Sequence, residues 1–240
     1  MSKMREMKES GIEWIGEIPS HWNIINFGMI CDVFGRIGFR GYTTEDLVDM
    51  GEGPITLSPS NIINQKLDLS KCSYISWKKY EESPEIQVFT NDIILVKTAS
   101  VGKCAIFNSN ELATLNPQLV VLKNIRFDYR FLYYVIVSDV VQTPILLDNF
   151  GSVIPTITQQ NLNHYKIVFP PLSEQKAIAD FLDRRCTEID AVIEQTKATI
   201  EEYKKLKQQI IIEAITKGIR ENRTFKDSGI DWMPFFLSKR

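Results

Sequence analysis

The residues that could support catalysis do not occur at the spacings that catalysis requires. Gly102-Lys103-Cys104 lacks the first glycine and the hydroxyl of a phosphate-binding loop. Glu202-Tyr203-Lys204 matches half of a nuclease motif, but it stands in a charged helical stretch without a strand-borne carboxylate to help hold Mg²⁺. Asn116-Pro117-Gln118 departs from the methyltransferase pattern Asn/Asp-Pro-Pro-aromatic and predicts a turn. The sequence therefore predicts no ATP hydrolysis, DNA cleavage or methylation by this chain.

Cysteine and histidine are too few and too scattered to predict a metal site or a nucleophile–base pair. The cysteines never form a C-x-x-C pair, and no Ser/His/Asp arrangement is evident. We therefore expect free thiols and no cofactor. The start of the chain lacks an apolar signal and no stretch is long enough to span a membrane, so we expect a cytoplasmic protein. The residues concerned are Cys31, Cys72, Cys104, Cys186, His21 and His164.

Residues 34–42 interleave glycine, aromatic and arginine residues and are the first candidate for contact with nucleic acid. Arginine can bond O6 and N7 of guanine in the major groove, and aromatic side chains can contact thymine methyl groups. Glycine would let the backbone approach the DNA closely. The alternative is an ordinary surface loop with exposed arginines. The candidate residues are Arg36, Gly38, Arg40 and Tyr42.

Two further groups of polar residues could contact phosphates. Lys97, Ser100 and Lys103 flank a predicted strand and turn, and Lys78 and Lys79 stand beside a tryptophan. Either group could equally be a solvated surface. The formal net charge of −2 gives no overall basic field, so DNA binding requires the cations to be sorted onto one face or supplied by a partner.

The elements that would position these residues form a mixed α/β domain. Apolar runs of strand length, bounded by Asn, Pro, Gly and Asp, occur at residues 93–96, 119–122 and 167–169. Helical pieces are expected at residues 43–50 and 129–143. Two tryptophans near the start, Trp14 and Trp22, are expected to be packing anchors.

One long stretch predicts a helix that needs a partner helix. Residues 173–216 contain no proline or glycine, Ser173 could cap the start, and Gly218 could mark the end. The apolar residues recur at alternating gaps of four and three, as in a coiled coil. At about 1.5 Å per residue the helix would be roughly 65 Å long, and this chain predicts no second long helix. The seam positions are Leu182, Cys186, Ile189, Ile193, Thr196, Ile200, Tyr203, Lys207, Ile210 and Ala214.

A short repeat stands near both ends of the sequence. Residues 8–14 and 226–232 agree at five of seven positions and exchange glutamate for aspartate at the other two, with an offset of 218 residues. Solenoid repeats have periods of about 20 to 50 residues, so this is not a solenoid. The pattern indicates one unit followed by the opening of a second.

Several stretches together resemble the specificity subunits of type I restriction-modification enzymes. The first is residues 8–22; the second is Gly-Ser-Val-Ile-Pro-Thr-Ile-Thr-Gln-Gln at 151–160; the third is Phe-Pro-Pro-Leu-Ser-Glu-Gln at 169–175 and its continuation. Residues 93–103 and 116–118 also match. The resemblance implies target-recognition domains that bind double-stranded DNA. It also implies conserved helices that pair as an antiparallel coiled coil and dock methylation subunits, through which restriction subunits join.

The expected architecture is α+β, with a mixed α/β target-recognition domain followed by one long coiled-coil helix. We expect a repeat segment at 1–22, the target domain at 23–170, the helix at 171–218 and a truncated second repeat at 219–240. The resemblance implies a half-length, non-catalytic DNA-recognition subunit, which we expect to pair with a second copy through its helix and to read a bipartite target. The alternative is a coiled-coil interaction or assembly protein without a DNA-binding role.

Overall fold

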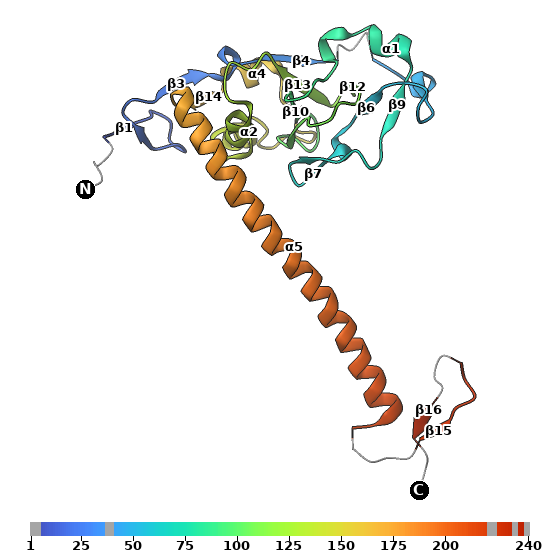
Figure 1. Ribbon diagram of the computed structural model, residues 1–240. Helices are drawn as coiled ribbons and strands as arrows, with labels where there is room; N and C mark the ends of the chain where they lie inside the picture. The colour runs from blue at the N-terminus through green and yellow to red at the C-terminus, as the bar shows by residue number, and fades with distance from the viewer. Residues whose placement is uncertain (1–5, 37–40, 220–224, 232–234, 238–240) are drawn as a thin grey trace. The chain divides into compact units, whose positions relative to one another are not determined.

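The computed structural model describes residues 6–36, 41–219, 225–231 and 235–237. The chain divides into two compact units, residues 1–182 and 183–240. The first unit contains two four-stranded sheets and four helices before the long helix, among the described residues (Figure 1). The mixed α+β fold predicted from the sequence is confirmed.

The central sheet is antiparallel, in the strand order β11-β10-β13-β4. Its strands include two of the apolar runs that the sequence predicted, and the third run forms β14, which pairs with β3. The bounds are β3 Asn23–Asn26, β4 Asp32–Gly35, β10 Ile93–Val96, β11 Cys104–Ile106, β13 Leu119–Lys123 and β14 Lys166–Phe169.

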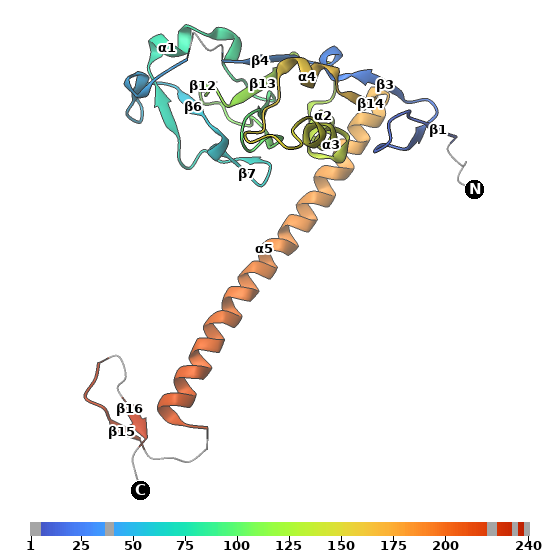
Figure 2. The ribbon, with the colours of Figure 1, turned by 180° about the vertical axis from the view of Figure 1, so that it is seen from behind.

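Both faces of the central sheet are buried, which explains why its strands read as unbroken apolar runs. Ile93 and Leu95 pack in one core with helices α2 and α3, whereas Ile94 and Val96 pack in a second core with the other sheet. This follows from the alternation of side chains along a strand. Figure 1 shows α2 and the strands β6 and β12 on opposite sides of β10 and β13, and Figure 2 shows the same arrangement about β13. The helices are α2 Tyr129–Val137 and α3 Asp139–Asp148.

The second sheet has the order β12-β6-β9-β5, with β12 parallel to β6. Two short hairpins, β1-β2 and β7-β8, complete the strands of this unit. The bounds are β1 Met7–Glu9, β2 Glu17–Pro19, β5 Leu47–Val48, β6 Ile55–Leu57, β7 Ile62–Ile63, β8 Lys66–Leu67, β9 Ser73–Ile75 and β12 Ala113–Leu115. The short helices are α1 Trp77–Glu81, α4 Gln159–His164, and the 3-10 turns η1 Phe27–Met29, η3 Thr44–Asp46, η4 Pro59–Asn61 and η5 Pro84–Ile86.

The helices predicted inside the domain needed correction. Residues 43–50 do not form a helix: Thr43 and Asp46 form a capping box around one 3-10 turn, after which β5 pairs with β9. Residues 129–143 form two helices, because Ser138 adopts an extended backbone that ends α2 and caps α3. The two helices meet at an angle of 48°.

The long helix α5, Leu172–Lys217, confirms the predicted helix. It begins one residue early, because the carbonyl of Pro171 accepts the first helical hydrogen bonds from Glu174 and Gln175. The expectation that Ser173 caps the helix is therefore wrong, since this residue lies inside the first turn. At the other end Gly218 has φ of +74° and donates to Ala214, as expected for a helix stop that favours glycine.

The first compact unit extends past the predicted end of the target domain at residue 170. The first turns of α5 belong to its core, where Ala179 is fully buried and Ile178 is packed against the same cluster. The base of the helix is therefore a part of the domain.

The two copies of the sequence repeat form the same hairpin. In the first copy Met7 pairs with Pro19 and Glu9 with Glu17. In the second, β15 (Phe225–Asp227) pairs with β16 (Phe235–Leu237) in a register that is shifted by the same 218 residues at every pair. The glycine in each copy has a left-handed backbone, with φ of +73° at Gly11 and +69° at Gly229. The repeat is thus a structural unit.

Within the described ranges, no single helix is long and apolar enough to cross a membrane. The bent pair of α2 and α3 meets the length and hydropathy requirements, but the apolar side of α2 is buried against the central sheet.

Candidate nucleic-acid interface

One edge of the central sheet brings together three of the segments that the sequence singled out. β4 ends at Gly35, which pairs with Val120, and β10 ends at Val96, which pairs with Leu119. Because β4 and β10 both run antiparallel to β13, their carboxyl ends lie where β13 begins. The backbone of Arg36, the segment that follows Val96 and the turn that precedes Leu119 therefore meet at this edge.

The turn from Lys97 to Lys103 is closed by backbone hydrogen bonds and held by a helix. The N–H of Val96 donates to Lys103 at 2.8 Å, and the N–H of Gly102 donates to Val96 at 3.1 Å. The side-chain amide of Gln142, on α3, donates to the carbonyl of Gly102 at 3.1 Å. Gly102 has φ of +88°, which favours glycine at this position. The turn that carries the candidate phosphate contacts is therefore rigidly positioned.

The turn at Asn116-Pro117-Gln118, predicted from the sequence, links this edge to the second sheet. The carbonyl of Gln118 accepts from the N–H of Lys97 at 2.9 Å, and the N–H of Asn116 donates to the carbonyl of Leu57 at 2.8 Å. The side-chain oxygen of Asn116 accepts from the N–H of Gln118, which closes the turn. The predicted turn is confirmed.

The segment that follows α3 runs along the other side of the Lys97 turn. Thr156 forms a bridge with Thr98, the N–H of Ala99 donates to the carbonyl of Pro155 at 2.9 Å, and the N–H of Ile157 donates to the carbonyl of Lys97 at 2.8 Å. Three stretches that are far apart in the sequence are thus hydrogen-bonded to one another at the sheet edge.

The cations of this turn are available for a ligand. Lys103 and Ser100 are exposed and Lys97 is half-buried. Among the described residues nothing forms a hydrogen bond or ion pair with the Lys97 ammonium, and burial lowers its pKa below the usual range. An anion placed beside Lys97 would offset that cost.

Acidic residues are absent from the three stretches that form this surface. No Asp or Glu occurs at residues 93–110, 112–127 or 149–173, in a chain that has 30 acidic residues among 240. The same stretches contain Lys97 and Lys103 at this edge, whereas Lys123 and Arg126 lie at and beyond the other end of β13 and form ion pairs with Asp92 and Asp32. The Lys97 turn therefore carries two cations and no carboxylate of its own segment, which favours contact with a polyanion in a protein of net charge −2.

Arg36 is placed differently from the expectation. It is only 5% exposed, and its guanidinium donates to the carbonyl of Leu115 at 2.9 Å and to the hydroxyl of Thr114 at 3.3 Å. It also lies over the ring of Tyr42, whose hydroxyl accepts from Thr56. The expectation that Arg36 projects freely from a loop is thus corrected, because the side chain ties β4 to the second sheet. A base contact would require it to leave these partners.

The candidate phosphate contacts Lys78 and Lys79 are not part of the Lys97 turn. Lys78 and Lys79 lie on α1, after a strand of the second sheet, and Lys79 forms an ion pair with Glu82 at 2.6 Å. Gly38 and Arg40 lie outside the described residues.

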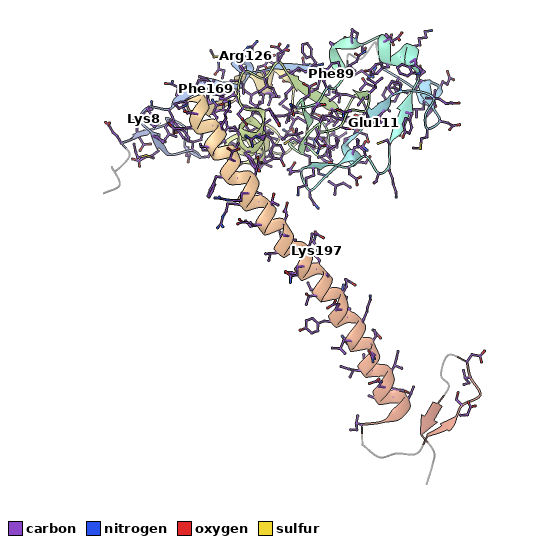
Figure 3. The ribbon with its side chains drawn as sticks, viewed as in Figure 1. Lys8, Phe89, Glu111, Arg126, Phe169 and Lys197 are labelled. Carbon is purple, nitrogen blue, oxygen red and sulfur yellow. The ribbon has the colours of Figure 1, made fainter. Side chains whose placement is uncertain are left out.

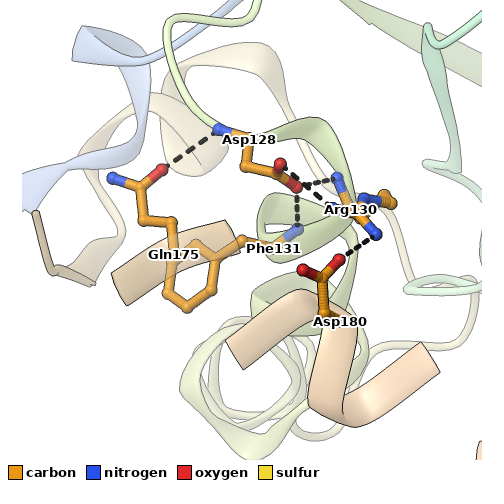
Figure 4. Close-up of polar contacts among 5 residues, drawn as sticks. All are labelled: Asp128, Arg130, Phe131, Gln175 and Asp180. Atoms are coloured by element: carbon orange, nitrogen blue, oxygen red, sulfur yellow. Dashed lines mark hydrogen bonds and ion pairs between the residues drawn. The ribbon is translucent and has the colours of Figure 1, made fainter. Parts of the chain in front are cut away.

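The base of α5 is locked to α2 by residues that sequence reasoning did not assign as functional (Figure 4). The side-chain oxygen of Gln175 accepts from the N–H of Asp128 at 3.0 Å, and its amide nitrogen donates to the carbonyl of Pro170 at 2.8 Å. The Asp128 carboxylate caps α2, and Arg130 pairs with Asp180 on α5 at 2.7 Å. The only signal in the sequence was the motif around residue 175.

Both predicted packing anchors have defined partners. The indole N–H of Trp22 donates to Glu174 at 3.0 Å, and His21 lies 2.6 Å from the other oxygen of that carboxylate. The indole of Trp14 donates to the carbonyl of Val140 at 3.4 Å. The repeat segment is therefore joined to both α5 and α3.

The apolar seam of α5 faces solvent in the single chain; Figure 3 shows the side chains of this helix on either side of Lys197. Of the predicted positions, Ile189, Ile193, Ile200, Tyr203 and Ile210 are exposed, and Leu182 and Cys186 are half-buried. Further exposed apolar residues lie off the seam at Val192, Leu206, Ile211, Ile212 and Ile215.

All four cysteines are free thiols, as the sequence predicted. Burial raises the pKa of Cys31 to about 12 and that of Cys104 still further. In the part of the chain that the structure describes, no cluster of His, Cys, Asp and Glu side chains could hold a metal ion.

Known proteins resemble this chain over most of its length. The family model described as the type I restriction modification DNA specificity domain matches residues 20–202. The putative type I restriction enzyme MjaX specificity subunit of Methanocaldococcus jannaschii is 29% identical over 229 residues, covering 92% of this chain and 51% of that protein. The chain spans about half the length of the curated relatives it matches.

Two solved structures share the fold. The HsdS subunit from Thermoanaerobacter tengcongensis superposes with a TM-score of 0.60 at 20% identity, covering 89% of this chain and 48% of that one. A chain solved in work on complex assembly and conformational transition of the type I R-M system superposes with a TM-score of 0.69 at 19% identity, covering 89% and 49%.

Proposed function

This chain belongs to the type I restriction modification DNA specificity family, and on that premise we propose that it recognises a specific sequence in double-stranded DNA without acting on the DNA chemically. The observation that carries the proposal is the edge of the central sheet. There, three acid-free stretches are hydrogen-bonded together around the turn from Lys97 to Lys103. Lys97, Ser100 and Lys103 bind phosphates, and other groups at this edge read the bases.

The catalytic steps belong to partner subunits. Methylation subunits would dock on the chain and restriction subunits would join through them, in the cytoplasm, so that this chain sets only where the complex acts. The chain spans about half of its curated relatives' length, and its described residues form one target domain. A bipartite target requires a second DNA-reading domain beside this one.

A second copy of the same chain would supply that domain. The exposed seam of α5 includes Ile189, Ile193, Ile200 and Ile210, and burying one large apolar side chain contributes about 1.5–3 kcal/mol. An antiparallel pair of α5 helices is closed by a two-fold axis and places one target domain at each end. Two identical domains related by that axis read identical half-sites in inverted orientation.

The length of α5 limits the spacing of the half-sites. With 46 residues at about 1.5 Å each, the helix is roughly 70 Å long. The centres of the half-sites are then separated by no more than about 20 base pairs at 3.4 Å each.

Selection from randomised duplex DNA tests the recognition step. The protein is incubated with the pool alone and with its methylation subunit, and bound DNA is sequenced. The proposal expects one enriched sequence in at least one of the two conditions. No enrichment in either would favour a coiled-coil assembly protein without a DNA-binding role.

Solution mass tests the pairing step. We expect a dimer by sedimentation equilibrium, which Ile200→Glu converts to a monomer because the charge would be buried in the seam. Ala198→Glu introduces the same charge two residues away, outside the seam, and should leave the dimer intact. A wild-type protein that stays monomeric at high micromolar concentration would contradict the pairing.

A further inference from the structure

The most exposed apolar side chains lie on one short loop that connects α3 and α4; both helices are labelled in Figure 2. Val153 is 97% exposed, Phe150 93% and Ile154 65%. Among the described residues, no large apolar side chain is more exposed than Val153 and Phe150. We call residues 150–154 the apolar loop. Leaving several such side chains in water is unfavourable in free energy, so their exposure indicates that a partner surface covers them.

The apolar loop is anchored at both ends. The side-chain oxygen of Asn149 accepts from the N–H of Thr156 at 2.6 Å, and its amide donates to the carbonyl of Ile145 at 2.8 Å. The N–H of Ser152 donates to the carbonyl of Asn149, and Gly151 turns the chain with φ of +76°. These hydrogen bonds hold the backbone of the loop in one conformation, so its side chains point in a fixed direction.

Two observations indicate what the loop contacts. Its carboxyl end continues into Pro155 and Thr156, which are hydrogen-bonded to the Lys97 turn, so the loop is continuous with the surface proposed to bind phosphates. It also lies in the acid-free stretch 149–173, so no carboxylate of its own segment would repel a polyanion. A DNA duplex offers apolar surface at thymine methyl groups and between base steps, which valine and isoleucine can contact.

We propose that Val153 and Ile154 contact the bases of the target DNA while Lys97 and Lys103 hold the phosphates beside them. This rests on the proposed function and adds specificity-determining residues to it. The division of roles predicts different signatures for the two groups. Loss of an apolar base contact changes which sequence is preferred, whereas loss of a lysine weakens binding to all sequences and lowers its salt dependence.

The test compares the wild-type protein, the double variant Val153→Ser/Ile154→Ser, and Met50→Ser. Met50 is 83% exposed on the turn before β6, so it is a matched surface substitution elsewhere. Each protein is used with the methylation subunit for selection from randomised duplexes, and affinity for the selected duplex is measured at several salt concentrations. Binding of the methylation subunit without DNA is measured in parallel.

We expect the double variant to lose about tenfold discrimination at one or a few adjacent positions, with an unchanged salt slope, unchanged subunit binding and unchanged unfolding. Met50→Ser should behave as wild type. Retained preference in the double variant would overturn the inference and leave the proposed function standing. Loss of subunit binding with the preference retained would also overturn it and assign the loop to a protein partner. A wild-type protein that selects no sequence would overturn both.

Discussion

The side-chain oxygen of Gln175, in the first turn of α5, accepts a hydrogen bond from the backbone N–H of Asp128 at 3.0 Å, across 47 residues of sequence. Gln175 is only 2% exposed, and its other end donates to Pro170. One buried amide thus joins the start of α5 to the start of α2. The packing of the first turn of α5 against the domain therefore depends on this contact.

Gln175→Ala should lower the free energy of unfolding by about 1–3 kcal/mol, because the N–H of Asp128 and the carbonyl of Pro170 lose a buried partner. Urea denaturation measures the change. Gln208→Ala removes the same side chain from an exposed position of the same helix and should change stability by less than about 0.5 kcal/mol. Equal effects of the two substitutions would show that the contact does not hold the helix base.

Gly102→Ala should cost more stability than Gly51→Ala. Both glycines have φ of +88°, so both substitutions carry the same backbone strain. At Gly51 an added Cβ would meet nothing within 4 Å, whereas at Gly102 it would lie 2.5 Å from the Gln142 amide oxygen. Gln142 must then move and lose its hydrogen bond to the carbonyl of Gly102, at an additional cost of about 1 kcal/mol. Thermal or urea unfolding of both variants gives the difference, and equal losses would refute the fixed position of this turn.

Arg36→Met should destabilise the fold by about 2 kcal/mol, because the carbonyl of Leu115 and the hydroxyl of Thr114 would be left buried without the guanidinium. The free energy of unfolding is the measurement. Unchanged stability together with an altered selected DNA sequence would return Arg36 to the base-reading role that its surroundings in the sequence suggested.

Lys97→Met should weaken DNA binding without lowering the free energy of unfolding. The half-buried ammonium has a pKa lowered by burial, so its removal should leave the unfolding free energy equal or higher. DNA affinity should fall across all sequences, with the dependence of log Kd on log salt reduced by about one unit of slope. Lys8→Gln, on the exposed strand β1, is the control for a lysine outside the surface. A variant with unchanged affinity and slope would remove Lys97 from the interface.

Local pattern was enough to predict much of the fold. The runs at 93–96 and 119–122 were recognisable because burial on both faces makes every residue apolar, and the uninterrupted stretch from 173 predicted α5 to within one residue at each end. The helix predicted at residues 43–50 was wrong for two reasons. A capping box closes a single 3-10 turn at Thr44–Asp46, and Leu47 then pairs with Ile75 in the second sheet.

The site was harder to predict because its geometry depends on distant partners. The partner atoms of Arg36 belong to Thr114 and Leu115, nearly 80 residues away in the sequence. The glycines and aromatic residues next to Arg36 therefore could not indicate that its side chain is buried. The lysines of the 97–103 turn were identified because they flank a predicted strand. The stretch that packs beside them, 154–157, stood out only as a motif whose place in the fold the sequence did not reveal.

The most direct measurement is a map of methylated positions. The chain is combined with its methylation subunit and a methyl donor on plasmid DNA, and modified bases are located by sequencing at single-base resolution. The account predicts that methylation occurs only within one recurrent sequence made of two inverted half-sites, and that Lys97→Met reduces its extent without changing that sequence. Methylation without sequence preference, or methylation whose sequence does not depend on this chain, would contradict the claim that the chain reads DNA.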